Sequence, residues 1–132
     1  MKSILIVVLS VLTSCQPSGK SEEKLSKESI AQQKFVDNIN YLDNKNSTFT
    51  ICYSQKVKTA LNPFPPLHYF IFDNQKQEVI FEENLANGFV KWIGMYKIEV
   101  RITPGIVSFD QENKSNKYIY DVQLRKKLKN NY

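Results

Sequence analysis

Few side chains in this chain of 132 residues could act as nucleophiles or metal ligands. There are two cysteines, Cys15 and Cys52, and a single histidine, His68. Structural zinc sites take four Cys or His ligands, and catalytic zinc sites usually take three protein ligands. A reactive thiol needs a basic neighbour, and nothing in the local sequence ties His68 to Cys52. We therefore predict no metal site and no cofactor, and we expect Cys52 to be a small, half-buried strand residue.

The carboxylates do not fall into a catalytic pattern either. Glu82 and Glu83 are adjacent, but neighbouring residues of a strand point to opposite faces and make a poor acid–base pair. The acidic segment 110–113 does not follow the spacing of a calcium-binding loop. No glycine-rich phosphate loop is present. We predict that the protein is not an enzyme; the opposite hypothesis needs His68 beside Cys52 or beside a carboxylate in a cleft.

The first fifteen residues carry the most specific signal in the sequence. Lys2 gives a positive start, and Ile4 to Leu12 form an apolar segment interrupted only by Ser10. This segment is shorter than the ~20 residues that a membrane-spanning helix needs. It leads into Leu12-Thr13-Ser14-Cys15. A short apolar segment followed by small residues is typical of a cleaved signal peptide.

Leu12-Thr13-Ser14-Cys15 resembles the lipobox of bacterial lipoproteins, in which a Leu stands three residues before the cut and an obligatory Cys follows it. The resemblance covers only the leader. It implies cleavage before Cys15 and a diacylglycerol thioether on its sulfur. Two or three acyl chains anchor a protein stably, so the chain is expected at a membrane of the cell envelope. Gln16 after the cysteine favours the outer membrane over the inner one.

The leader divides the chain into three expected parts. Residues 1–14 are the signal peptide, residues 15–27 are the lipidated cysteine with a polar tether, and residues 28–132 form a single small domain. A hydrophobic content of 42% and an aromatic content of 12% suffice for a core. The net charge of +5 is modest and spread along the chain, which favours solubility over a nucleic-acid partner.

Segment 29–42 is predicted to be the only helix of the domain. Phe35, Ile39 and Leu42 recur at helical spacing. Ser26 or Ser29 is expected to cap its start. The polar segment 43–47 is expected to end it.

From residue 48 onward, alternation and short apolar runs predict β-strands. The expected strands are 48–53, 68–73, 78–82, 89–93, 96–102, 106–109 and 118–124, followed by a basic tail at 125–132. In segment 96–102, the even-numbered residues are expected to face the core and the odd-numbered residues, Lys97, Glu99 and Arg101, to face water. Asn87-Gly88 predicts a type I′ hairpin, and Gly94-Met95 predicts a type II′ turn.

Six or seven short strands in meander order must bury one face. We therefore predict a mainly β fold, a small antiparallel barrel or two-layer sandwich, with the N-terminal helix packed against it. The segments Tyr69-Phe70-Ile71-Phe72-Asp73 and Tyr118-Ile119-Tyr120-Asp121 are similar. We interpret them as two equivalent strand ends that lead into turns, because the chain is too short for a propeller.

Most aromatic residues fall within strands and belong to the expected core. Phe64, in a proline-rich loop, and Trp92, near a predicted turn, are the candidates for a binding surface. Proline stiffens such a loop, and a stiff aromatic side chain binds at low entropic cost. The leading hypothesis is a membrane-anchored, non-enzymatic protein that binds another envelope protein, as an accessory subunit or an immunity-type protein. The alternative is a lipoprotein that binds a small ligand or glycan through exposed aromatics.

Overall fold

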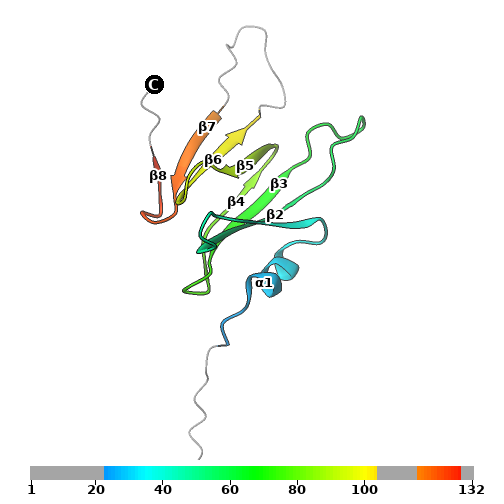
Figure 1. Ribbon diagram of the computed structural model, residues 1–132. Coiled ribbons are helices and arrows are strands. Elements are labelled where there is room, and N and C mark those ends of the chain that lie inside the picture. The colour runs from blue at the N-terminus through cyan, green and yellow to red at the C-terminus, as the bar shows by residue number, and fades with distance from the viewer. Residues whose placement is uncertain (1–22, 104–115, 129–132) are drawn as a thin grey trace, which may run out of the picture.

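The computed structural model describes residues 23–103 and 116–128 and shows a mainly β protein, as predicted (Figure 1). Its elements are α1 (Lys27–Lys34), β1 (Ile39–Asp43), β2 (Phe49–Gln55), β3 (Leu67–Asp73), β4 (Glu78–Leu85), β5 (Gly88–Trp92), β6 (Lys97–Ile102), β7 (Asn116–Asp121) and β8 (Lys126–Leu128). The predicted signal peptide, the lipobox, the strand 106–109, the acidic segment 110–113 and the end of the basic tail lie outside the described residues. The described part of the chain contains no helix long and apolar enough to span a bilayer.

The strands form two antiparallel sheets, each of four strands in meander order. Sheet A has the order β1-β2-β3-β4, and sheet B has the order β5-β6-β7-β8. One cluster of buried side chains from both sheets forms the main core between them. A second cluster lies between α1 and the other face of sheet A. Of the two predicted architectures, the structure has the two-layer one, with eight strands among the described residues instead of six or seven.

The predicted helix 29–42 was wrong in its second half. Ser26 caps α1 as expected, since its hydroxyl accepts the backbone N–H of Ser29 at 3.2 Å. The helix ends at Lys34, and Asn38 then adopts a left-handed φ of 51° that redirects the chain. The residues that follow form β1, which pairs with β2. Strand pairing therefore prevails over a helical spacing in which asparagines contribute little helix propensity.

Three predictions about turns and strand ends also need correction. Asn87-Gly88 does not close a hairpin, because β4 and β5 belong to different sheets and Gly88 begins β5. A hairpin does join β5 to β6, but Gly94 lacks the positive φ that a type II′ turn requires. The last predicted strand ends at Asp121 instead of residue 124, and the basic tail returns as β8.

Sheet B repeats sheet A along the chain. Phe49 pairs with Asp73 between β2 and β3, and Lys97 pairs with Asp121 between β6 and β7, a constant offset of 48 residues. The turns that follow Asp73 and Asp121 end with matching left-handed residues, Gln77 (φ 54°) and Arg125 (φ 53°). The two similar segments are thus equivalent strand ends, as interpreted from the sequence.

The repeat fixes which face each sheet presents. Ile51 and Tyr69 of sheet A face sheet B, whereas their equivalents, Glu99 and Lys117, lie on the outer face of sheet B. The sheets therefore stack in the same orientation, and the layers follow the order α1, sheet A, sheet B (Figure 1). The last layer ends the stack because charged side chains replace apolar ones on its outer face.

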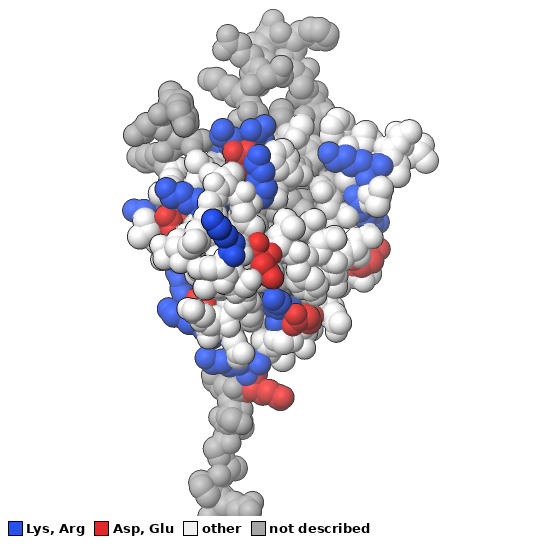
Figure 2. Space-filling view, viewed as in Figure 1, with Lys and Arg blue, Asp and Glu red and all other residues white. Residues whose placement is uncertain are grey.

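Glu99 faces outward as predicted, but it is not open to water. Only 8% of it is exposed, because Arg101 lies 2.7 Å and Lys117 lies 3.9 Å from its carboxylate oxygens. Figure 2 shows the same mixing of signs over the face in view, where lysine and arginine side chains alternate with acidic ones. This face has no single-sign field that would attract a polyanion.

Gly88 allows the chain to cross between the sheets, so its replacement should destabilise the fold. Its φ of 141° is unfavourable for other residues, and an added Cβ would overlap the carbonyl oxygen of Arg101. We expect Gly88→Ala to lower the free energy of unfolding by about 2–4 kcal/mol in urea titrations. Gly94→Ala is the matched control, because nothing lies within 4 Å of its Cβ position. Equal effects of the two substitutions would contradict this role of Gly88.

Candidate functional site

The loop 56–66 between β2 and β3 carries several large apolar side chains that are exposed at one end of the domain. Leu61 is 99% exposed, Val57 is 76% exposed and Phe64 is 55% exposed. The loop projects beyond sheet A at the upper right of Figure 1. Prolines at positions 63, 65 and 66 restrict its backbone. The sequence identified Phe64 as a candidate binding residue, and the structure leaves that ring half exposed.

Backbone hydrogen bonds hold the tip of this loop in place. The N–H of Thr59 donates to the carbonyl of Asn62 at 3.1 Å, and the N–H of Asn62 donates back at 3.2 Å. At the base of the loop, the side-chain amide of Gln55 donates to the carbonyls of Pro65 (3.1 Å) and Gly88 (3.2 Å). Leu61 is therefore presented from a braced turn.

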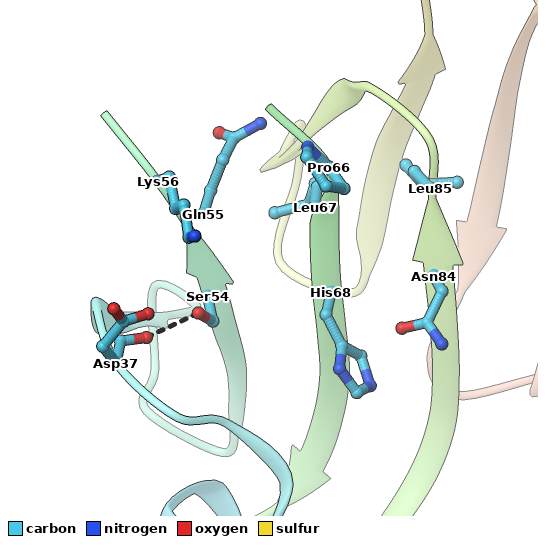
Figure 3. A pocket seen from close by; sticks show the side chains of 9 residues that line it. All are labelled: Asp37, Ser54, Gln55, Lys56, Pro66, Leu67, His68, Asn84 and Leu85. Carbon is cyan, nitrogen blue, oxygen red and sulfur yellow. Dashed lines mark hydrogen bonds between the residues drawn. The ribbon is translucent and has the colours of Figure 1, made fainter. Parts of the chain in front are cut away.

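A shallow, mostly apolar hollow of about 240 Å³ adjoins the base of the loop (Figure 3). Pro66, Leu67 and Leu85 form its apolar part, and Leu67 and Leu85 are themselves core residues. Its rim is polar and comes from β2, β3, β4 and the segment before β1. The rim residues are Asp37, Ser54, Gln55, Lys56, His68 and Asn84.

His68 lies on the rim of this hollow, in a charged cluster that ties α1 to sheet A. Its Nε2 lies 3.0 Å from one oxygen of Glu82, and the Nζ of Lys34 lies 2.7 Å from the other. The ring of Phe35 meets the imidazole edge-on at 4.8 Å between centroids. Hydrogen bonds from Lys34 and then from His68 lower the pKa of the Glu82 carboxyl below its ordinary value.

The described residues do not assemble a nucleophile with this histidine. Ser54 is the cross-strand neighbour of His68, but its hydroxyl donates to the carbonyl of Asp37 at 2.6 Å. In Figure 3 the imidazole points away from Ser54. Cys52 is fully buried, and burial raises the pKa of its thiol to about 12. His68 thus lies beside a carboxylate at the rim of a hollow, as the enzyme hypothesis requires, but neither Ser54 nor Cys52 is placed to act as its nucleophile.

The second predicted binding residue, Trp92, occupies a different place from Phe64. Its indole N–H donates to the carbonyl of Leu42 at 2.9 Å, and its ring packs against the main core. Trp92 thus links the edge of β5 to β1 and does not line the hollow.

The sequence interpretation missed Leu61 and Val57. Their signal was available, because they are large apolar residues inside a loop too short and too proline-rich to bury them. Among residues 23–103 and 116–128, no three His, Cys, Asp or Glu side chains gather in a way that would hold a metal ion. Comparison with known proteins finds no matching family model, no matching curated protein and no matching solved structure.

The burial of Cys52 predicts an unreactive thiol. In the Cys15→Ala chain, Cys52 is the only cysteine, so a thiol reagent reports on it alone. At pH 8 we expect negligible labelling of the folded protein and complete labelling in urea, because the thiol is inaccessible and its pKa is about 12. Rapid labelling of the folded protein would contradict the packing of α1 over Cys52.

The lowered pKa of Glu82 predicts how the free energy of unfolding depends on pH. A carboxyl with a depressed folded-state pKa stabilises the fold above its ordinary value of 4.5, and this contribution disappears as the pH falls through the folded-state pKa. Glu82→Gln should therefore destabilise the protein at pH 7, and the difference from the parent should disappear as the pH falls through the lowered pKa of Glu82. Because the side chain is 37% exposed, we expect a difference of at most about 1 kcal/mol.

Lys34→Met provides the control, because Lys34 is the largest cause of the shift. It should remove most of the same pH-dependent difference in urea titrations. A Glu82→Gln effect that persists unchanged at low pH would show that the ion pair is not its origin.

Proposed function

We propose that this chain is a membrane-anchored envelope protein whose small β domain binds another protein. The binding region is the apolar loop with the adjoining hollow, here named the docking surface and defined by Val57, Leu61, Phe64, Leu67 and Leu85. The membrane anchor is the lipid on Cys15 that the lipobox resemblance implies, with Gln16 favouring the outer membrane. This part of the proposal is supported by the leader sequence alone.

The observation that carries the proposal is the near-complete exposure of Leu61 on a braced turn. Single exposed apolar residues are common on protein surfaces, whereas clustered ones mark interaction sites. Val57 and Phe64 extend the exposed apolar area along the same loop. Because the loop is already ordered, a partner would not have to supply the free energy of ordering it.

The chemistry of the docking surface indicates the kind of partner. The hollow is large enough for one apolar side chain, which would lie against Leu67 and Leu85. Lys56 and Lys58 flank the exposed loop, and the sequence contains no Asp or Glu between residues 55 and 72. A partner with an apolar anchor residue and an acidic rim would match both features. An accessory subunit of an envelope complex and an immunity-type protein both fit this description.

The proposal predicts that one substitution on the loop abolishes partner capture. We would crosslink the tagged protein in its native membrane fraction and identify captured proteins by mass spectrometry. The parent chain should capture one dominant protein, and Leu61→Asp should reduce its recovery at least about tenfold by placing a charge in the apolar contact. Leu124→Asp is the matched control, because Leu124 is 61% exposed on the β7–β8 turn, away from the loop.

Capture that survives Leu61→Asp would contradict the docking surface. Recovery from membranes without a reproducible partner would contradict the protein-binding function itself. The Cys15→Ala chain separates anchoring from binding, since it should no longer associate with the membrane but should keep its affinity for the purified partner. Sedimentation of the Cys15→Ala chain with anionic lipid vesicles, lost in Leu61→Asp, would assign the loop to lipid and overturn the proposal.

A further inference from the structure

A second hollow lies at the opposite end of the two sheets from the loop 56–66. Four hairpin turns surround it, namely 44–48 and 74–77 of sheet A and 93–96 and 122–125 of sheet B. Its volume is about 400 Å³. This size falls within the ~300–1,000 Å³ of small-molecule sites. The lining is mainly polar, in contrast to the apolar hollow beside the loop.

Two equivalent turns beside this hollow carry the same pair of residues, an aspartate and a glutamine two positions later. One oxygen of Asp73 accepts the backbone N–H groups of Gln75 (2.9 Å) and Lys76 (3.0 Å). One oxygen of Asp121 likewise accepts the backbone N–H groups of Gln123 and Leu124, both at 2.9 Å. The repeated aspartate is therefore explained by the turn itself, which needs an acceptor at this position.

The repeated glutamine has no such explanation. The turn uses only the backbone N–H of Gln75 and of Gln123, and any residue except proline supplies that group. Both side chains line the hollow, and neither side-chain amide is hydrogen bonded to another described residue. Two carboxamides, each able to donate and accept, thus reach the hollow from equivalent places in the two sheets.

Aromatic rings form one wall of the same hollow. Phe49 and Tyr96 both line it and meet edge-to-face with 6.2 Å between centroids. The side chain of Asn46 donates to the Tyr96 hydroxyl at 3.2 Å and fixes the position of that ring. Lys76 and Arg125 add positive charge at the rim, and Arg125 also pairs with Glu78 at 2.6 Å.

We infer that this hollow, here named the turn-end site, binds a sugar residue that is neutral or carries one carboxylate. The two carboxamides match neighbouring hydroxyls, which also donate and accept. The aromatic wall suits the apolar C–H face of a sugar ring. Lys76 suits a carboxylate on that ring. The turn-end site shares no residue with the docking surface, so the inference is independent of the proposed protein-binding function.

The test is a titration of the isotope-labelled Cys15→Ala chain, followed by NMR, with N-acetylglucosamine and with N-acetylmuramic acid. The side-chain amide signals of Gln75 and Gln123 should shift saturably, with a dissociation constant on the order of 1 mM. The double variant Gln75→Ala/Gln123→Ala should weaken binding at least about tenfold. Gln33→Ala is the matched control, because this glutamine is exposed on α1, and it should leave the binding curve unchanged.

Lys76→Ala tests the role of the positive charge, since it should weaken the binding of N-acetylmuramic acid more than that of N-acetylglucosamine. Absence of saturable shifts with both sugars would overturn the inference. The double glutamine variant lacks those side-chain signals, so its binding is followed by the backbone amide of Tyr96, which also lines the hollow. Saturation of that signal at the same sugar concentration as in the parent would overturn the inference too. The double glutamine variant should capture the protein partner as well as the parent does. A negative sugar titration would therefore overturn only the turn-end site and not the proposed docking surface.

Discussion

The contact between the two sheets holds this fold together, because a four-stranded meander alone leaves an entire apolar face in water. Ile51 and Ile71 of sheet A and Ile98 and Val100 of sheet B are fully buried in that contact. Burying each such side chain stabilises the fold by about 1.5–3 kcal/mol. The chain can form the contact only by crossing between the sheets directly after β4. Gly88 allows this crossing, since its backbone lies where the carbonyl of Arg101 leaves no room for a Cβ.

Both open sides of this contact are closed by hydrogen bonds that join the sheets. On the β1–β5 side, Trp92 donates to the carbonyl of Leu42. On the β4–β8 side, the carboxylate of Glu83 accepts the hydroxyls of Tyr69 (2.8 Å) and Tyr118. Burial, followed by the charge of Glu83, raises the pKa of Tyr69, which therefore stays a donor throughout the physiological range. Trp92, which the sequence suggested as a candidate binding residue, thus belongs to the contacts that hold the two sheets together.

The stacked arrangement gives the two ends of the molecule different chemistry. At one end, the connection between β2 and β3 is long enough to leave the core and carry apolar side chains into solvent. At the other end, all four hairpin turns meet, and their polar residues enclose a hollow. The proposed docking surface and the proposed turn-end site therefore lie at opposite ends of the sheets, and the first is mainly apolar whereas the second is mainly polar. The ion pairs of α1 with Glu82 and Asp43 keep the first layer on sheet A, and Glu82 also contacts His68 at the rim of the apolar hollow.

Local sequence patterns were enough to predict the mainly β class, several strands, a helix cap at Ser26 or Ser29 and a proline-rich loop with Phe64. The lipobox resemblance of the leader is likewise a local pattern, and it stays a prediction. These follow from local patterns that hold wherever the segment lies in space. Three features could be seen only in the folded chain: residues 39–43 form a strand, Asn87-Gly88 crosses between the sheets, and Trp92 joins β5 to β1. The tertiary structure also decided which glutamines share a hollow. Each of these depends on a partner far along the chain, and the free energy of long-range pairing exceeds the weak local preferences that periodicity and turn chemistry report.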